Sequence, residues 1–327
     1  MQAVSLYKSA AQIYTRDTLD RQGFGTMLAL VAAVISGFAI PANKLFVVSM
    51  DPAVFTALRA LIIGLVFLLL AGFQSGFDFK RFKGASWKQL AAIGVIGGGI
   101  AFLLYFTGLG LTTAGRAAFL HKTLPLFAGI FAAVFLKERL PRRHWYALLA
   151  MLIGAFMVYF AAIPPGAWWA NTGLGDLFVV GAAMLWAVES TIARKVMKDG
   201  GSNLVVSFAR MFIGAIVLFA AVFLLGRTDA LLAISAAQAL NIFASTAILF
   251  GYVFFWYWSL KHIGLGRASA LLLVAPVISL LVGVWWFGEP VPLMEAAGCA
   301  LILAGAWVVA RANGGHGMEH EASPQTQ

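Results

Sequence analysis

Long apolar stretches alternate with short polar loops along almost the whole chain. Each is close to the ~20 residues that a helix needs to cross the hydrocarbon core of a bilayer. The stretches lie at about 25–43, 52–72, 88–108, 114–136, 143–162, 174–193, 203–225, 240–260, 267–287 and 291–310. The alternating ten-residue pattern of membrane strands does not occur. The sequence therefore predicts an all-α integral membrane protein with ten transmembrane helices, numbered here as spans 1 to 10.

Composition supports the same class of protein. Of the 327 residues, 61% are hydrophobic and 11% are charged, which is far from the balance of a soluble domain. The net charge of +10 would suggest a nucleic-acid partner in a soluble protein. Here the basic residues gather in loops between apolar stretches, where the positive-inside rule explains them. We expect the lipid bilayer, and no nucleic acid, as a partner.

The distribution of Lys and Arg predicts the orientation of the chain. Seventeen lie before span 1, in the loops after spans 2, 4, 6 and 8, or after span 10, whereas the opposite loops hold Lys44, Arg116 and Arg227. This bias predicts a multi-pass protein of the inner or plasma membrane with both termini cytoplasmic. Residues 1–24 then form a cytoplasmic N-terminal segment. Residues 311–327, rich in Gly, Pro, Ser and Gln, form a tail that we expect to be disordered.

A repeat divides the spans into two groups of five. "GRAAFLHKTLP" at 115–125 matches "GRASALLLVAP" at 266–276, with an offset of 151 residues. The same offset relates further pairs: Arg59 and Arg210, Glu138 and Glu289, Gly154 and Gly305. A fixed offset over several helices indicates duplication of residues 25–162 as 174–310. Because five is odd, the second copy crosses the membrane upside down, and such inverted repeats are typical of secondary transporters.

These features resemble a known family. Each half has "GRA" and a proline on its fourth span and an acidic residue at the end of that span, in "FLKERLP" and "WFGEPVP". In this the chain is similar to the drug/metabolite transporter superfamily, specifically its EamA-type branch. The resemblance implies export of small metabolites, often amino acids or their relatives. It also implies a central cavity between spans 1–4 and 6–9, with spans 5 and 10 at the periphery. The superfamily includes carriers of sugar-nucleotides and phosphorylated sugars, so the fold leaves the substrate open.

Three ionisable residues inside spans are the first candidates for substrate binding. Lys122 lies about 12 Å deep on span 4, where a lysine facing lipid is costly, so it should face a cavity or a partner. Because adjacent residues on a helix point about 100° apart, His121 and Lys122 cannot both face the same centre, and His121 is the weaker candidate. Glu189 lies about 20 Å deep on span 6, counted from Asp176. It is either a structural partner of Lys122, the second pole of a zwitterion site, or a proton carrier.

Aromatic side chains add further candidates for the wall of a binding pocket. Tyr105 on span 3 and Trp186 on span 6 lie deep, and Tyr257 belongs to "FFWYW" on span 8. The glycine run "GVIGGGIAF" in span 3 indicates close helix packing.

Other residues are candidates for hinges or gates. Pro125 and Pro276 each remove a backbone donor inside a span, which predicts a kink near the midplane and a hinge. We expect Arg59 and Arg210 to snorkel to opposite interfaces or to bond helix-end carbonyls, in a structural or gating role. The same role is predicted for Arg116 and Arg267 at the starts of spans 4 and 9. Glu138 and Glu289 are their candidate gate partners.

Together these observations favour a secondary transporter that exports a small metabolite, such as an amino acid or related carboxylate, by alternating access. The sequence contains no nucleotide-binding loop and no metal-ligand cluster, so we expect no cofactor and transport driven by gradients. The alternative is an intramembrane enzyme with Glu189 and His121 as acid and base. The inverted repeat favours the transporter, since an enzyme has no need of two-sided access. The sequence leaves open whether the carrier works as a homodimer.

Overall fold

The computed structural model describes residues 2–46, 50–76, 85–161, 163–168, 173–288 and 290–311. Within these ranges it is built of helices and contains no strand. Ten of its helical stretches are long and apolar enough to cross a membrane, which confirms the predicted fold class.

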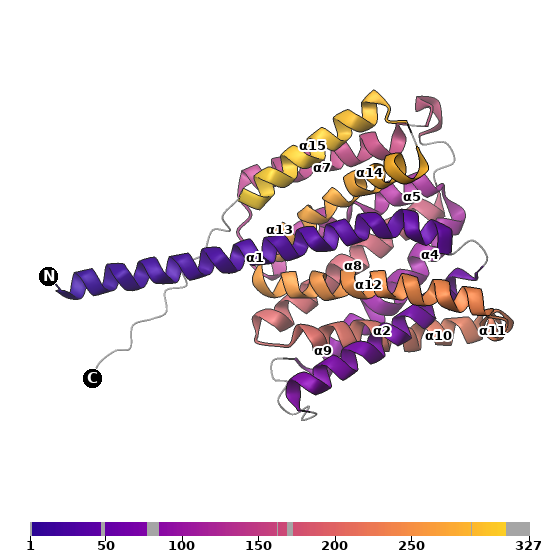
Figure 1. The fold of residues 1–327 in the computed structure, drawn as a ribbon, viewed down its shortest axis with the longest axis horizontal. Helices are drawn as coiled ribbons and strands as arrows, with labels where there is room; N and C mark the ends of the chain where they lie inside the picture. The colour runs from indigo at the N-terminus through magenta and orange to yellow at the C-terminus, as the bar shows by residue number, and fades with distance from the viewer. Residues whose placement is uncertain are drawn as a thin grey trace.

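The first half contains spans 1 to 5. Span 1 is part of a 45-residue helix that protrudes from the bundle on its N-terminal side (Figure 1). The elements of this half are α1 (Gln2–Phe46), α2 (Pro52–Ser75), α3 (Trp87–Ala92), the π-helix η2 (Ile93–Ile100), α4 (Ala101–Leu111), α5 (Ala114–His121), α6 (Leu124–Phe135) and α7 (Arg142–Phe160). Span 3 therefore consists of α3, η2 and α4, and span 4 of α5 and α6.

The second half contains spans 6 to 10 and follows a short 3-10 turn, η3 (Pro165–Ala167). Its elements are α8 (Leu174–Lys198), α9 (Asn203–Phe208), the π-helix η4 (Ala209–Ile213), α10 (Gly214–Leu224), α11 (Thr228–Leu232), α12 (Ala236–His262), α13 (Leu265–Leu271), the 3-10 turn η5 (Leu272–Val274), α14 (Ala275–Phe287) and α15 (Leu293–Arg311). Span 7 consists of α9, η4 and α10, and span 9 of α13, η5 and α14.

Spans 4 and 9 are interrupted at corresponding positions. Helix α5 ends at His121 and α6 begins at Leu124, while α13 ends at Leu271 and α14 begins at Ala275. Each second segment carries its proline, Pro125 or Pro276, in the first turn, where a missing N–H costs little. The predicted kinks are thus confirmed as breaks in the helix, and they preserve the repeat.

The two halves interlock through the middle of the bundle. Helix α1 packs along α12, α4 along α8, and α2 along α10, so each pair joins the first half to the second. Helices α7 and α15 pack along each other at one edge of the molecule (Figure 1), as expected for spans 5 and 10. They approach closely, because a Cβ added at Gly154 would lie 2.5 Å from the carbonyl oxygen of Gly298.

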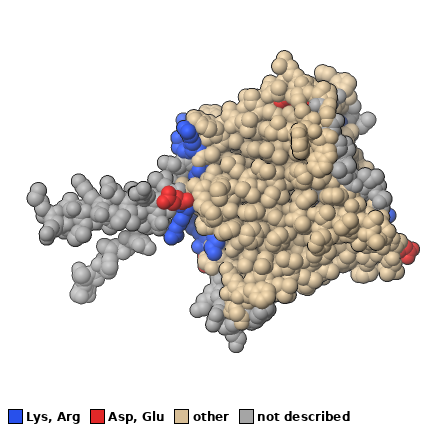
Figure 2. All heavy atoms as spheres, viewed as in Figure 1, with Lys and Arg blue, Asp and Glu red and all other residues tan. Residues whose placement is uncertain are grey.

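Charged residues distinguish the two ends of the bundle. Lys and Arg gather at the end from which α1 protrudes, where α15 also terminates (Figures 1 and 2). We call this the basic end; it carries the loops after spans 4, 6 and 8, with Arg139, Lys195, Lys198 and Lys261. The opposite end, called the far end, carries Arg116, Asp176 and Arg227.

Candidate functional site

A fully buried carboxylate lies inside span 6. Glu189 is 0% exposed, and its Oε2 lies 3.5 Å from Nη1 of Arg210 on span 7 and accepts a 3.2 Å hydrogen bond from Ser190 Oγ. Its Oε1 accepts a short hydrogen bond from the hydroxyl of Tyr257 on span 8. Arg210 Nη1 also donates to that hydroxyl at 3.0 Å. Glu189, Arg210 and Tyr257 are called the Glu189 cluster below; they join three spans through hydrogen bonds and opposite charge.

Two glycines of span 3 bring its backbone against this cluster. A Cβ at Gly97 would overlap the side chain of Glu189, and one at Gly98 would overlap the backbone carbonyl of Arg210. The indole nitrogen of Trp186 donates to the carbonyl of Gly97 at 2.9 Å and fixes the register of spans 3 and 6. Both π-helices lie at this contact, because η2 packs against η4. π-Helical turns are rare and frequently occur at functional sites. The contacts of Gly97 and Gly98 confirm the predicted close packing of the glycine run.

A second group of side chains gathers at the break in span 4. The ring of His121 lies 5.5 Å from that of Tyr105 and 5.1 Å from that of Trp186, and the last two rings are 5.5 Å apart. We call these three residues the aromatic cluster. Trp186 lies three residues before Glu189 on α8, so this cluster is one helical turn from the Glu189 cluster.

Lys122 lies in the same break, as the residue that follows α5. Its side chain is only 7% exposed. Within the described parts of the chain its ammonium makes no ion pair and no hydrogen bond. A lysine inside a span normally faces either a partner or a water-filled cavity.

The predicted pair of Lys122 and Glu189 is not what the structure shows. Both carboxylate oxygens of Glu189 are occupied by groups from spans 6, 7 and 8, and its cationic partner is Arg210. A substrate ammonium at Glu189 would therefore have to share these oxygens with groups of the protein.

The prediction that Arg59 and Arg210 snorkel to the interfaces was also wrong. Arg210 is 7% exposed and is held by the Glu189 cluster. Arg59 is 6% exposed, donates to Ser245 Oγ at 2.6 Å and lies 4.3 Å from the ring centre of Phe55. Arg59 finds a partner in the second half, and Arg210 finds its partners on neighbouring spans of its own half. These contacts remove the reason for either guanidinium to reach for water.

Polar contacts join the two halves at both ends of span 4. At the far end Arg116 forms a 3.2 Å ion pair with Asp176 of span 6, which we call the far-end pair. At the basic end the carboxylate of Glu138 accepts hydrogen bonds from the backbone N–H groups of Leu265 and Gly266, at 2.8 and 3.1 Å, where span 9 begins. Arg194 of span 6 lies 3.7 Å from the same carboxylate. We call this arrangement the basic-end latch.

Of the two predicted gate acids, Glu138 meets the start of span 9 through backbone N–H groups rather than through the guanidinium of Arg267. Arg116 and Glu138 lie at opposite ends of span 4 and do not meet. Arg267, predicted to pair with an acidic residue, donates to the carbonyl of Ala310 and to Gln22 Oε1. Glu289 lies outside the described residues. The latch depends on amides at the N-terminus of a helix, where the helix dipole and free N–H groups attract a carboxylate.

The two residues proposed as acid and base of an intramembrane enzyme have different partners. His121 packs in the aromatic cluster, whereas Glu189 is enclosed by the groups described above. In the part of the chain that the structure describes, no three His, Cys, Asp or Glu side chains are arranged to hold a metal ion.

Ten membrane-length helices in two repeats, with a buried charge cluster where the repeats meet, define a membrane transporter built from an inverted duplication. The chain belongs to the EamA-like transporter family, whose model matches it twice, over residues 23–160 and 173–311. It is therefore a multi-pass membrane protein of the drug/metabolite transporter superfamily.

Similar proteins are themselves transporters. An uncharacterized transporter of Archaeoglobus fulgidus is 28% identical over 283 residues, covering 84% of this chain and 94% of its own. The uncharacterized transporter YyaM of Bacillus subtilis is 23% identical, covering 85% and 91%. A riboflavin transporter of Vibrio cholerae is 35% identical, but over only 85 residues, which is 26% of each chain. A solved structure, described as a crystal structure of a protein, matches with a TM-score of 0.72 at 22% identity, covering 88% of this chain and 99% of that one, and supports the fold.

The Glu189 cluster predicts strong thermodynamic coupling between Glu189 and Arg210. Glu189→Gln and Arg210→Met should each lower the free energy of unfolding in detergent by about 3 kcal/mol, because each leaves a buried group without its partner. The double variant should recover most of that loss. Glu189→Gln combined with Lys122→Met serves as the control and should be additive within about 0.5 kcal/mol. Additive losses for Glu189 and Arg210, with coupling to Lys122 instead, would show that the wrong pair has been identified.

Proposed function

We propose that this protein is a secondary transporter that exports a small metabolite with an anionic group, such as an amino acid or a related carboxylate. Transport proceeds by alternating access. The observation that carries this proposal is the charge of Lys122, which is buried in span 4 and has no ion pair among the described residues. A substrate anion is the partner that this ammonium lacks.

The pairing of Glu189 with Arg210 supports recognition of the substrate through its anionic group. Arg210 and Tyr257 both contact the Glu189 carboxylate, so a substrate ammonium at Glu189 would compete with groups of the protein. A lysine ammonium is a compact charge with three donors, which suits a carboxylate or a phosphate. Phosphorylated compounds are therefore the second substrate class to test.

The aromatic cluster supports a substrate that also has a flat or apolar part. Tyr105 and Trp186 pack against His121, the residue before Lys122. The three rings offer faces and edges to a flat or apolar group. The Vibrio cholerae relative is named for a ring compound, and although its match is short, riboflavin belongs in the panel of compounds.

The breaks and the contacts at the two ends supply the parts that alternating access requires. The far-end pair and the basic-end latch both join the first half to the second, so each can release while the other holds. The breaks beside Pro125 and Pro276 divide spans 4 and 9 into segments, which gives each half a hinge near the middle of the membrane. Nothing in this arrangement requires catalysis, and we propose no enzymatic activity.

Lys122→Met should abolish substrate binding while the protein still folds. Purified protein is screened in liposomes against amino acids, other carboxylates, phosphorylated sugars, nucleosides and riboflavin, by flux and by equilibrium binding. Removing a charge-assisted contact to the substrate should lower affinity at least about tenfold. The matched control is Leu273→Met at the corresponding position of the second half, which should leave flux unchanged. A Lys122→Met protein with wild-type flux of every transported compound would remove Lys122 from the substrate site.

The charge asymmetry leads us to propose that the basic end is cytoplasmic in the inner or plasma membrane. Single cysteines replace Gly166, between spans 5 and 6, and Lys198, between spans 6 and 7, in a Cys299→Ala background. An impermeant thiol reagent applied to intact cells should label Gly166→Cys and spare Lys198→Cys. The reverse labelling would contradict this orientation and place the basic end outside the cell.

A further inference from the structure

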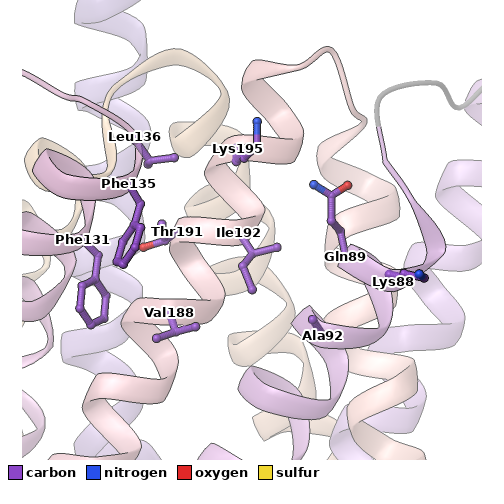
Figure 3. Close-up of a pocket in the computed structure, with 10 residues that line it drawn as sticks. All are labelled: Lys88, Gln89, Ala92, Phe131, Phe135, Leu136, Val188, Thr191, Ile192 and Lys195. Atoms are coloured by element: carbon purple, nitrogen blue, oxygen red, sulfur yellow. The ribbon is translucent and has the colours of Figure 1, made fainter.

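A groove separate from the two clusters opens at the basic end. It lies over α8, between α6 on one side and α3 on the other, with a volume of about 470 Å³. Figure 3 shows the rings of Phe131 and Phe135 along one wall and Val188 and Ile192 on the floor. The hydroxyl of Thr191 on the floor is already bonded to the carbonyl of Ala187 at 2.7 Å. The depth of the groove is therefore apolar.

The mouth of the groove is basic. Lys88 lies near the start of α3, and Lys195 lies on the last turn of α8 (Figure 3). Lys195 forms an ion pair with Asp199 at 3.0 Å, but with both side chains about half exposed this contact is weak and leaves the ammonium available. Trp87, beside Lys88, is 73% exposed, as is typical of an indole at the level of the lipid headgroups.

We propose that this groove binds an anionic phospholipid of the leaflet at the basic end, with the phosphate between Lys88 and Lys195. One acyl chain then lies along the apolar floor toward Val188, about 10 Å deeper on α8. The groove matches such a lipid in both charge and polarity. Its two ammonium groups lie where the headgroup would be, and its aromatic and aliphatic walls lie where the acyl chain would be. A soluble metabolite would leave most of that apolar surface without a partner.

Such a lipid would contact the part of span 4 that follows the break. Phe131 and Phe135 belong to α6, the segment that begins just after Lys122. A bound acyl chain would hold α6 against α8, so that the lipid composition of the membrane would influence how readily span 4 bends at its break.

Native mass spectrometry of the full-length protein tests this proposal, with phosphatidylglycerol and phosphatidylcholine of identical acyl chains as probes. The wild type should prefer phosphatidylglycerol, and Lys88→Gln and Lys195→Gln should each lower the preference about fivefold. Lys198→Gln is the matched control, because this lysine lies at the same end of α8 but does not line the groove. Ala92→Phe, which fills the groove, should weaken binding of both lipids.

Four results would overturn the proposal. The preference could persist in the Lys88→Gln, Lys195→Gln double variant, or fall equally in Lys198→Gln, which would indicate general surface charge. Binding could be unaffected by Ala92→Phe, which would place the lipids elsewhere. Soluble glycerol phosphate could displace the lipid at equal concentration, which would identify a site for free phosphate compounds. Because none of these measurements uses transport, their outcome is independent of the substrate.

Discussion

The burial of one carboxylate, Glu189, constrains the middle of this transporter. An ionised carboxylate inside a membrane is costly unless opposite charge and hydrogen bonds surround it. Arg210 and Tyr257 provide both, so spans 6, 7 and 8 must meet at one depth. Span 3 must in turn approach without a side chain, which Gly97 permits. The π-helices η2 and η4 lie at this contact, where the regular helical geometry of two spans is interrupted.

The duplication supplies a symmetric backbone, while the chemistry is asymmetric. Spans 4 and 9 break at equivalent residues, but the first break holds His121 and Lys122, whereas the second holds Leu272 and Leu273. Leu273 is fully buried, so the second break is an apolar hinge. In the proposed mechanism the two breaks serve as a symmetric pair of hinges, and the single charged break gives the substrate one preferred orientation. The proposed contact of Lys122 with the substrate would explain why only one half has a charge at this position.

The sequence predicted the features that depend on local pattern. Span length, the repeat and the breaks before Pro125 and Pro276 follow from hydrophobic periodicity and proline chemistry. The repeat does not reveal Arg210 as the partner of Glu189. It relates Arg210 to Arg59, which suggests a structural or gating role common to both arginines. Counting residues from the loop between spans 6 and 7 does indicate the pair. Glu189 lies ten residues before Asp199, about 15 Å from that loop, and Arg210 lies eight residues after Ser202, about 12 Å from it. The latch could not be predicted, because Glu138 meets backbone amides 127 and 128 residues away and no side-chain pattern marks them.

Distance measurements at both ends of one molecule test alternating access most directly. Spin labels at Arg139 and Lys198 report the basic end, and labels at Gly110 and Asp229 report the far end, in nanodiscs and a Cys299→Ala background. Releasing the latch with Glu138→Ala should lengthen the distance at the basic end and sharpen the far-end distribution toward its short value. Releasing the far-end pair with Arg116→Met should do the reverse. Both distances lengthening together would indicate a channel, and neither changing would show that these contacts hold no gate; either result would contradict alternating access through them.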